Sequence, residues 1–155
     1  MNRYLFVIDY QNDFVDGALG FPGAEKLDAG IAAKVREYGK GHVLFTRDTH
    51  FENYLDTREG KNLPVKHCIK GSFGWEVYGQ TAKALAEVEA PAIDKLVFGM
   101  DVTDPATAAV LQSKYPEAKV LVDASCTDSF DKSLHEKVLD VLEGFQVTVV
   151  NRTGK

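Results

Sequence analysis

Residues 42–75, HVLFTRDTHFENYLDTREGKNLPVKHCIKGSFGW, contain the pattern on which the predicted fold and site depend. The segment begins with a short β-branched and aromatic run, HVLFT, which is typical of a buried strand. Asp48 and His50 follow this run, and a polar loop then leads to His67. Because a strand end is a rigid support, this carboxylate and the two imidazoles can converge on one divalent cation.

The mixed oxygen and nitrogen donors favour zinc, with manganese or iron as alternatives, over calcium. Glu59 or Asp56 in the same loop offers a further oxygen ligand. A structural interpretation is equally compatible with the spacing: Asp48 and His50 as ordinary loop polar residues, and His67 packed under a turn. Spacing alone leaves the two interpretations open.

Outward from this segment, apolar runs of strand length alternate with stretches of helical periodicity. The predicted strands are residues 4–8, 43–46, 93–98, 119–122 and 146–150, and the predicted helices are 27–38, 77–88, 104–114 and 134–142. Such alternation predicts an α/β fold, with a mostly parallel five-stranded sheet between helix layers in a three-layer α/β/α arrangement. No linker or repeat interrupts the chain, so we predict a single domain over residues 1–155.

Right-handed crossovers place the carboxyl ends of parallel strands at one edge of the sheet, where ligands bind. Asp9 follows the apolar first strand, and a desolvated carboxylate there is suited to proton transfer. Asp9 alternatively caps the amides of its own loop. Lys95 lies inside an apolar strand, where it either pairs with Asp9 or extends its amine to water.

Cys126 lies between a predicted strand and a predicted helix. A thiol near a helix N-terminus and a lysine is favoured as thiolate and can act as a nucleophile. The alternative is a small buried apolar residue, which is the common role of a single cysteine. Cys68, beside His67, is expected to pack rather than react.

Composition excludes several functional classes. The chain has 155 residues, 45% hydrophobic residues and a formal charge of −5, without a basic run, so nucleic acid is not an expected partner. No apolar stretch is long enough to cross a bilayer. Asp9 interrupts the apolar N-terminus and no small-residue cleavage site follows, so we expect a buried strand there and not a signal peptide. Two cysteines form no disulfide framework, and we expect a cytoplasmic protein. The glycines of residues 71–74 do not form a phosphate loop, and no organic cofactor is expected.

Three segments resemble the isochorismatase-like cysteine hydrolases, the family that includes the nicotinamidases. Residues 7–14, VIDYQNDF, are similar to the family's first strand, and residues 93–99, IDKLVFG, to the strand with its lysine. Residues 46–50, TRDTH, and 63–71, LPVKHCIKG, are similar to its metal-binding segment. The resemblance implies that Asp9 and Lys95 are catalytic.

By the same resemblance, Asp48, His50 and His67 are metal ligands with Glu59 close by, and Gln11 and Phe14 bind substrate.

The second half departs from the family pattern, in which the nucleophile follows Thr-Asp-x. In one register Ala106 stands in the cysteine position, and in the other Phe130 does. Cys126 would then be a relocated nucleophile, and one strand–helix unit of the family sheet would be missing.

The resemblance implies hydrolysis of a small amide. Because neither register places a cysteine in the nucleophile position, the alternative is a family member that has lost the covalent chemistry and binds a small amide or aromatic acid, or a protein partner. The resemblance also implies a homo-oligomer.

Overall fold

The computed structural model describes residues 3–96 and 117–153. The chain divides into two units, Met1–Gly99 and Met100–Lys155, and each is described here by itself. The single domain expected over residues 1–155 therefore stays a prediction. Within the described ranges, no helix is both long enough and apolar enough to cross a membrane.

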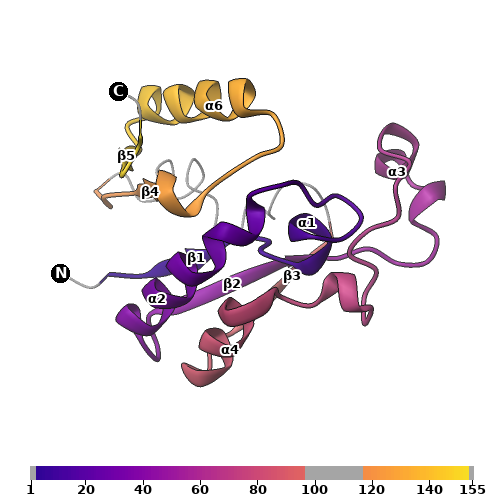
Figure 1. Cartoon of the computed structure of the whole chain (residues 1–155), viewed down its shortest axis with the longest axis horizontal. Coiled ribbons are helices and arrows are strands. Elements are labelled where there is room, and N and C mark those ends of the chain that lie inside the picture. The colour runs from indigo at the N-terminus through magenta and orange to yellow at the C-terminus, as the bar shows by residue number, and fades with distance from the viewer. Residues whose placement is uncertain (1–2, 97–116, 154–155) are drawn as a thin grey trace. The chain divides into compact units, whose positions relative to one another are not determined.

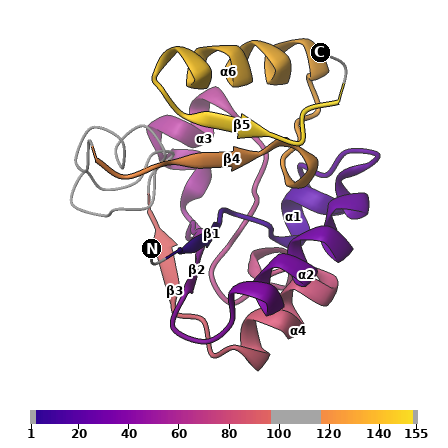
Figure 2. The same ribbon diagram turned by 90° about the vertical axis from the view of Figure 1, so that its left-hand side faces the viewer.

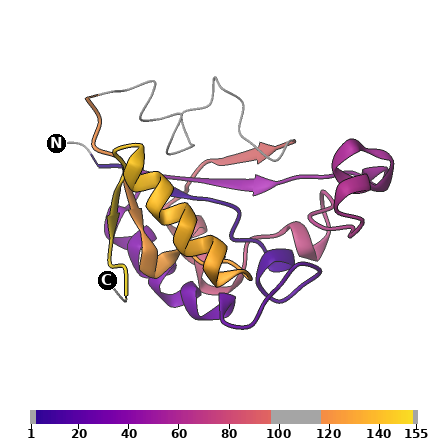
Figure 3. The same ribbon diagram turned by 90° about the horizontal axis from the view of Figure 1, so that it is seen from above.

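The first unit contains a three-stranded parallel sheet in the order β1-β2-β3, formed by β1 (Leu5–Val7), β2 (Val43–Asp48) and β3 (Ala92–Lys95). Figure 3 shows β2 and β3 running side by side in the same direction. The register pairs Asp48 with Lys95 at the carboxyl ends of these strands. Two charged side chains from distant parts of the sequence thus meet at one edge.

The described part of the first unit, residues 3–96, contains four helices: α1 (Asn12–Val15), α2 (Asp28–Tyr38), α3 (Arg58–Asn62) and α4 (Gly79–Glu87). Three short 3-10 turns accompany them, at Ala24–Leu27, Tyr54–Asp56 and Phe73–Trp75. Helices α2 and α4 pack on each other and lie on the same side of the sheet (Figures 1 and 2).

Helix α2 buries the periodic residues Ile31 and Val35 and ends at Gly39, whose φ of 71° suits a glycine. The long connection from β2 to α4 contains α3, beyond the carboxyl end of β2 (Figure 3).

The second unit contains a two-stranded parallel sheet of β4 (Leu121–Asp123) and β5 (Thr148–Val150), with a 3-10 turn at Ala124–Cys126. Helix α6 (Lys132–Gly144) connects the strands and packs on β5 (Figure 2). Leu139 is the buried residue of this helix, at 1% exposed.

The α/β class and the parallel pairing of the strands are confirmed. Within the described residues, the strands form a parallel sheet of three in the first unit and a parallel pair in the second. Strand β2 continues to Asp48 instead of ending at Thr46, because Asp48 still pairs with Lys95. The predicted helix 104–114 lies outside the described residues, as does the segment that bears on a missing strand–helix unit.

Candidate active site and metal centre

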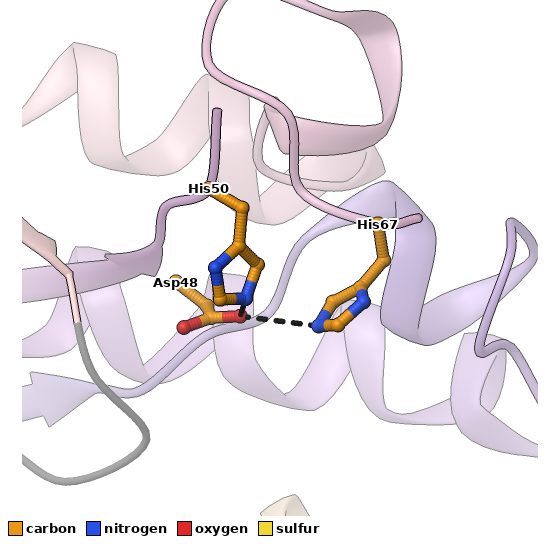
Figure 4. A group of neighbouring side chains, drawn as sticks. All are labelled: Asp48, His50 and His67. Carbon is orange, nitrogen blue, oxygen red and sulfur yellow. Dashed lines mark ion pairs between the residues drawn. The ribbon is translucent and has the colours of Figure 1, made fainter. Parts of the chain in front are cut away.

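Asp48, His50 and His67 form a cluster of buried ligand atoms, all within 4.8 Å of one another. The Nε2 atoms of His50 and His67 lie 3.0 and 3.4 Å from the same Asp48 oxygen, Oδ2 (Figure 4). The three residues are 5%, 7% and 3% exposed in sequence order. Figure 4 shows both rings turned toward the carboxylate.

Backbone pairing brings the two histidines together. The N–H of His50 donates to the Cys68 carbonyl at 2.9 Å, and the N–H of Lys70 donates to the His50 carbonyl at 2.9 Å. This short parallel bridge between His50 and Ile69 holds the loop against the end of β2. His67 therefore lies beside His50 although a long loop separates them in sequence.

The orientation of His67 suits a ligand. Its Nδ1 lies 2.8 Å from the Val65 carbonyl. A carbonyl can only accept, so Nδ1 carries a proton, and a neutral ring in this tautomer would direct its Nε2 lone pair at the cluster. Among the residues that the structure describes, none forms a hydrogen bond with the buried Nε2 of His50, despite the nearby carboxylate.

A buried nitrogen without a hydrogen bond is costly, and a cation at this point would satisfy it. One carboxylate oxygen and two imidazole nitrogens form a donor set that zinc, manganese and iron(II) accept. The residues present therefore fit a divalent metal of this kind. Glu59 is close enough to contribute, since its Oε1 lies 3.8 Å from His50 Nε2.

The cluster is electrostatically coupled. Burial alone would raise the pKa of Asp48, but the hydrogen bond with His67 and the positive charges of the imidazoles and Lys95 lower it. Burial alone would lower the pKa of His67, but its bonds to Asp48 and the Val65 carbonyl raise it. Without a metal, the charged forms of His67 and Asp48 therefore stabilise each other.

Aromatic rings pack against the two imidazoles. Tyr54 lies 4.5 Å from His50 and 5.0 Å from His67 between ring centroids, and its hydroxyl donates to the Leu63 carbonyl at 2.9 Å. Phe14 meets His67 edge to face at 5.7 Å. Sequence reasoning did not find Tyr54, because an aromatic residue in a polar loop has no periodic pattern to mark it.

Asp9 and Lys95 form an ion pair at the carboxyl ends of β1 and β3, with 2.5 Å between Lys95 Nζ and Asp9 Oδ2. Lys95 is only 8% exposed. The Thr46 hydroxyl donates to Asp9 Oδ1 at 2.7 Å and accepts from the Asp9 N–H at 3.2 Å. Asp9 has a φ of 51°, so a turn in the chain, held by Thr46, directs its carboxylate to Lys95. Thr46 was not predicted.

This pair adjoins the candidate metal site of Asp48, His50 and His67. Lys95 is the register partner of Asp48, and its charge contributes to the lowered pKa of Asp48. The sequence expectation that Asp9 and the histidines belong to one sheet edge is consistent with this register.

Gln11, expected to bind substrate, is completely buried. Its carboxamide donates to the Asp48 and Trp75 carbonyls, each at 2.9 Å, and accepts from the Asp48 N–H at 2.7 Å. All of these bonds go to backbone groups. The structure thus shows Gln11 supporting Asp48, and a substrate contact stays untested.

The two cysteines have different surroundings. Cys68 is fully buried and burial raises the pKa of its thiol, which makes it a poor nucleophile, as expected. Cys126 is partly exposed in the 3-10 turn after β4. Helix α6 begins only at Lys132, with Asp131 as its N-cap, so Cys126 does not lie in its first turn. The helix dipole acts within that turn, and the expected helix contribution to a thiolate is not provided by α6.

The structure describes one of the two possible cysteine positions of the family motif. Ala106 lies outside the described residues. Phe130, in the other register, is 79% exposed just ahead of α6.

A family model described as the isochorismatase domain matches residues 3–114. No curated protein matches the chain. The fold is similar to a pyrazinamidase/nicotinamidase from Streptococcus mutans, with a TM-score of 0.77 and 21% identity over 96% of this chain and 99% of that one.

A pyrazinamidase of Pyrococcus horikoshii in complex with zinc has a TM-score of 0.73 and 19% identity, over 98% of this chain and 100% of that one. Yeast nicotinamidase bound to the inhibitor nicotinaldehyde has a TM-score of 0.74 and 18% identity, over 97% and 100%. With its family domain spanning residues 3–114 and its fold shared with these enzymes, the chain belongs to the isochorismatase family.

Proposed function

We propose that this protein hydrolyses the C–N bond of a small planar amide of the nicotinamide type. The observation that carries the proposal is the ion pair between the buried Lys95 and the partly buried Asp9, in which the lysine is the register partner of Asp48 in the candidate metal site. A proton-transfer group and a Lewis-acid site at one sheet edge suit amide hydrolysis. The solved nicotinamidase and pyrazinamidase structures share the fold.

In the proposed reaction Asp9 accepts the proton of the attacking thiol, which we assign to Cys126. The thiolate adds to the amide carbonyl, and the tetrahedral adduct collapses as Asp9 returns the proton to the departing ammonia. Water then attacks the thioester while Asp9 accepts its proton, which releases the acid and restores the thiol. Lys95 stabilises the thiolate and holds Asp9 in place.

A divalent metal held by Asp48, His50 and His67, with Glu59 close by, would polarise or anchor a ring nitrogen or a water. Phe14, which packs on His67, is proposed to contact the substrate ring. Gln11 was expected to contact substrate as well, but its buried amide supports a role in holding Asp48. The predicted homo-oligomer and cytoplasmic location stay predictions.

The test is ammonia release from nicotinamide and pyrazinamide by the zinc- or manganese-loaded protein. We expect turnover that falls by roughly 10²-fold or more in Asp9→Asn, as for loss of a general acid–base group. Cys126→Ala should abolish turnover. Full activity in Cys126→Ala would remove the nucleophile assignment, and no turnover of any small amide would remove the proposal.

A second candidate is a family member that binds a small amide or aromatic acid without covalent catalysis. It is favoured by the thiols: Cys68 is buried with a raised pKa, and Cys126 lies ahead of α6 rather than in its first turn. Saturable binding of nicotinamide or nicotinate by calorimetry, without ammonia release, would support it. Asp9-dependent turnover would exclude it.

A further inference from the structure

Helix α1 and the residue before it present three consecutive polar side chains that each bind a distant segment. Gln11 binds the backbone of Asp48, and Asn12 donates to the Phe73 carbonyl at 2.7 Å. Asp13 accepts from the Cys68 N–H at 2.7 Å through Oδ2, and from the Ala18 N–H at 3.1 Å through Oδ1. Of these three side chains, Asp13 binds Cys68, the residue that directly follows His67.

Cys68 has an unusual backbone. Its φ is 47°, a left-handed conformation that residues with a side chain adopt only when their surroundings hold them there. Both of its backbone polar groups are held, the N–H by Asp13 and the carbonyl by the His50 N–H. Cys68 therefore joins the segments that carry the two imidazoles, and its conformation sets how they face each other.

Gly74 makes room for the Asp13 carboxylate. A Cβ added at Gly74 would lie 2.1 Å from Asp13 Oδ2 and 2.3 Å from its Cγ. The atoms it would meet belong to a side chain, so the carboxylate, rather than backbone, would have to move. Substituting Gly74 thus displaces the Asp13 carboxylate while leaving Asp13 and every proposed ligand in the sequence.

We propose that Asp13 is a positioning residue for the metal centre, acting by holding the left-handed turn at Cys68 so that His67 directs Nε2 at Asp48 and His50. The inference rests on the metal centre of the proposed function but not on amide hydrolysis. Support of ligands by neighbouring groups commonly changes metal affinity by roughly 10- to 100-fold.

The experiment measures zinc affinity by competition with a chromophoric chelator and records the visible spectrum of the cobalt(II)-loaded protein. Asp13→Ala and Gly74→Ala are each expected to bind zinc roughly 10-fold or more weakly and to change the cobalt spectrum, with all ligands present. Asp13→Asn keeps one acceptor oxygen and should lose less affinity than Asp13→Ala. Circular dichroism verifies that the variants are folded.

Asn12→Ala is the matched control, because Asn12 lies in the same helix, is 4% exposed and also binds a distant carbonyl. It should lower the melting temperature yet keep the zinc affinity and cobalt spectrum. Unchanged zinc affinity in both Asp13→Ala and Gly74→Ala, or an equal loss in Asn12→Ala, would refute the positioning role alone. If the unmodified protein binds neither metal, the proposed metal centre fails together with this inference.

Discussion

Lys95 stands opposite Asp48 in the β2–β3 ladder while its amine contacts Asp9 at 2.5 Å. One lysine thus borders both the proposed proton-transfer group and the proposed metal centre. Because Lys95 is buried, its charge depends on the Asp9 carboxylate for compensation, since an unpaired buried charge is strongly destabilising.

Replacing Lys95 tests this dependence. Lys95→Met leaves the Asp9 carboxylate without its cation, so we expect a loss of about 3 kcal/mol in the free energy of unfolding. The double variant Lys95→Met/Asp9→Asn removes both charges and should recover part of this loss. Urea unfolding of the single and double variants measures the coupling. Strictly additive losses would show that the ion pair contributes nothing.

Metal binding should stabilise the fold. At a free zinc concentration of about 100 times the dissociation constant, a site specific for the folded state adds about 2.7 kcal/mol. We expect the melting temperature to rise with zinc and to return to its initial value with a chelator. In His67→Ala this rise in melting temperature should disappear. Glu59→Gln should retain most of it, because the Oε1 atom of Glu59 lies as far as 3.8 Å from His50 Nε2. An unchanged zinc response in His67→Ala would exclude His67 as a ligand.

The metal-free protein should show a characteristic pH dependence. The raised pKa of His67 contributes stability that is complete below the ordinary value of 6.5 and is lost as pH rises through the folded-state value. The lowered pKa of Asp48 contributes stability that is complete above 3.8 and is lost as pH falls through its folded-state value. The Asp48–His67 pair therefore stabilises the folded protein most between pH 3.8 and pH 6.5.

Thermal melts of chelator-treated protein from pH 5 to 9 measure this effect. His67→Gln should reduce the decline in melting temperature as the pH rises above neutral. An identical decline in that variant would assign the pH dependence to other groups.

Cys68 offers a test of backbone conformation. Cys68→Ala should cost only about 1 kcal/mol and leave turnover unchanged, because its buried thiol is not proposed to react. Cys68→Val should cost about 1–2 kcal/mol more, since a β-branched residue tolerates a φ of 47° poorly. Chemical unfolding and an ammonia-release assay distinguish the two effects. Abolished turnover in a folded Cys68→Ala protein would make Cys68 the nucleophile.

Asp28 stabilises α4 from another helix. Its carboxylate accepts from the N–H groups of Gln80 and Thr81, each at 2.8 Å. Asp28→Ala leaves these amides without partners and should cost about 2 kcal/mol in the free energy of unfolding. Zinc affinity should stay unchanged, and a large loss of affinity would show that α4 helps to form the metal centre.

Much of the architecture follows from local pattern. The apolar runs around residues 4–8 and 43–46 form β1 and β2, and the periodic residues Ile31 and Val35 form the buried face of α2. These elements are predictable because strand and helix periods are written into neighbouring residues. The spacing of Asp48, His50 and His67 likewise indicated a candidate metal site, and the structure brings these three side chains together.

Sequence alone determined which residue types follow which strands, and hence the candidates Asp9, Lys95 and the three ligands. Only the tertiary structure decided that Thr46 holds Asp9, that Gln11 turns inward to Asp48, and that Asp13 holds Cys68. The Gln11 and Asp13 contacts join residues 37 and 55 positions apart. No local period records such pairings, because they form only when separate strands and loops have been brought to the same edge.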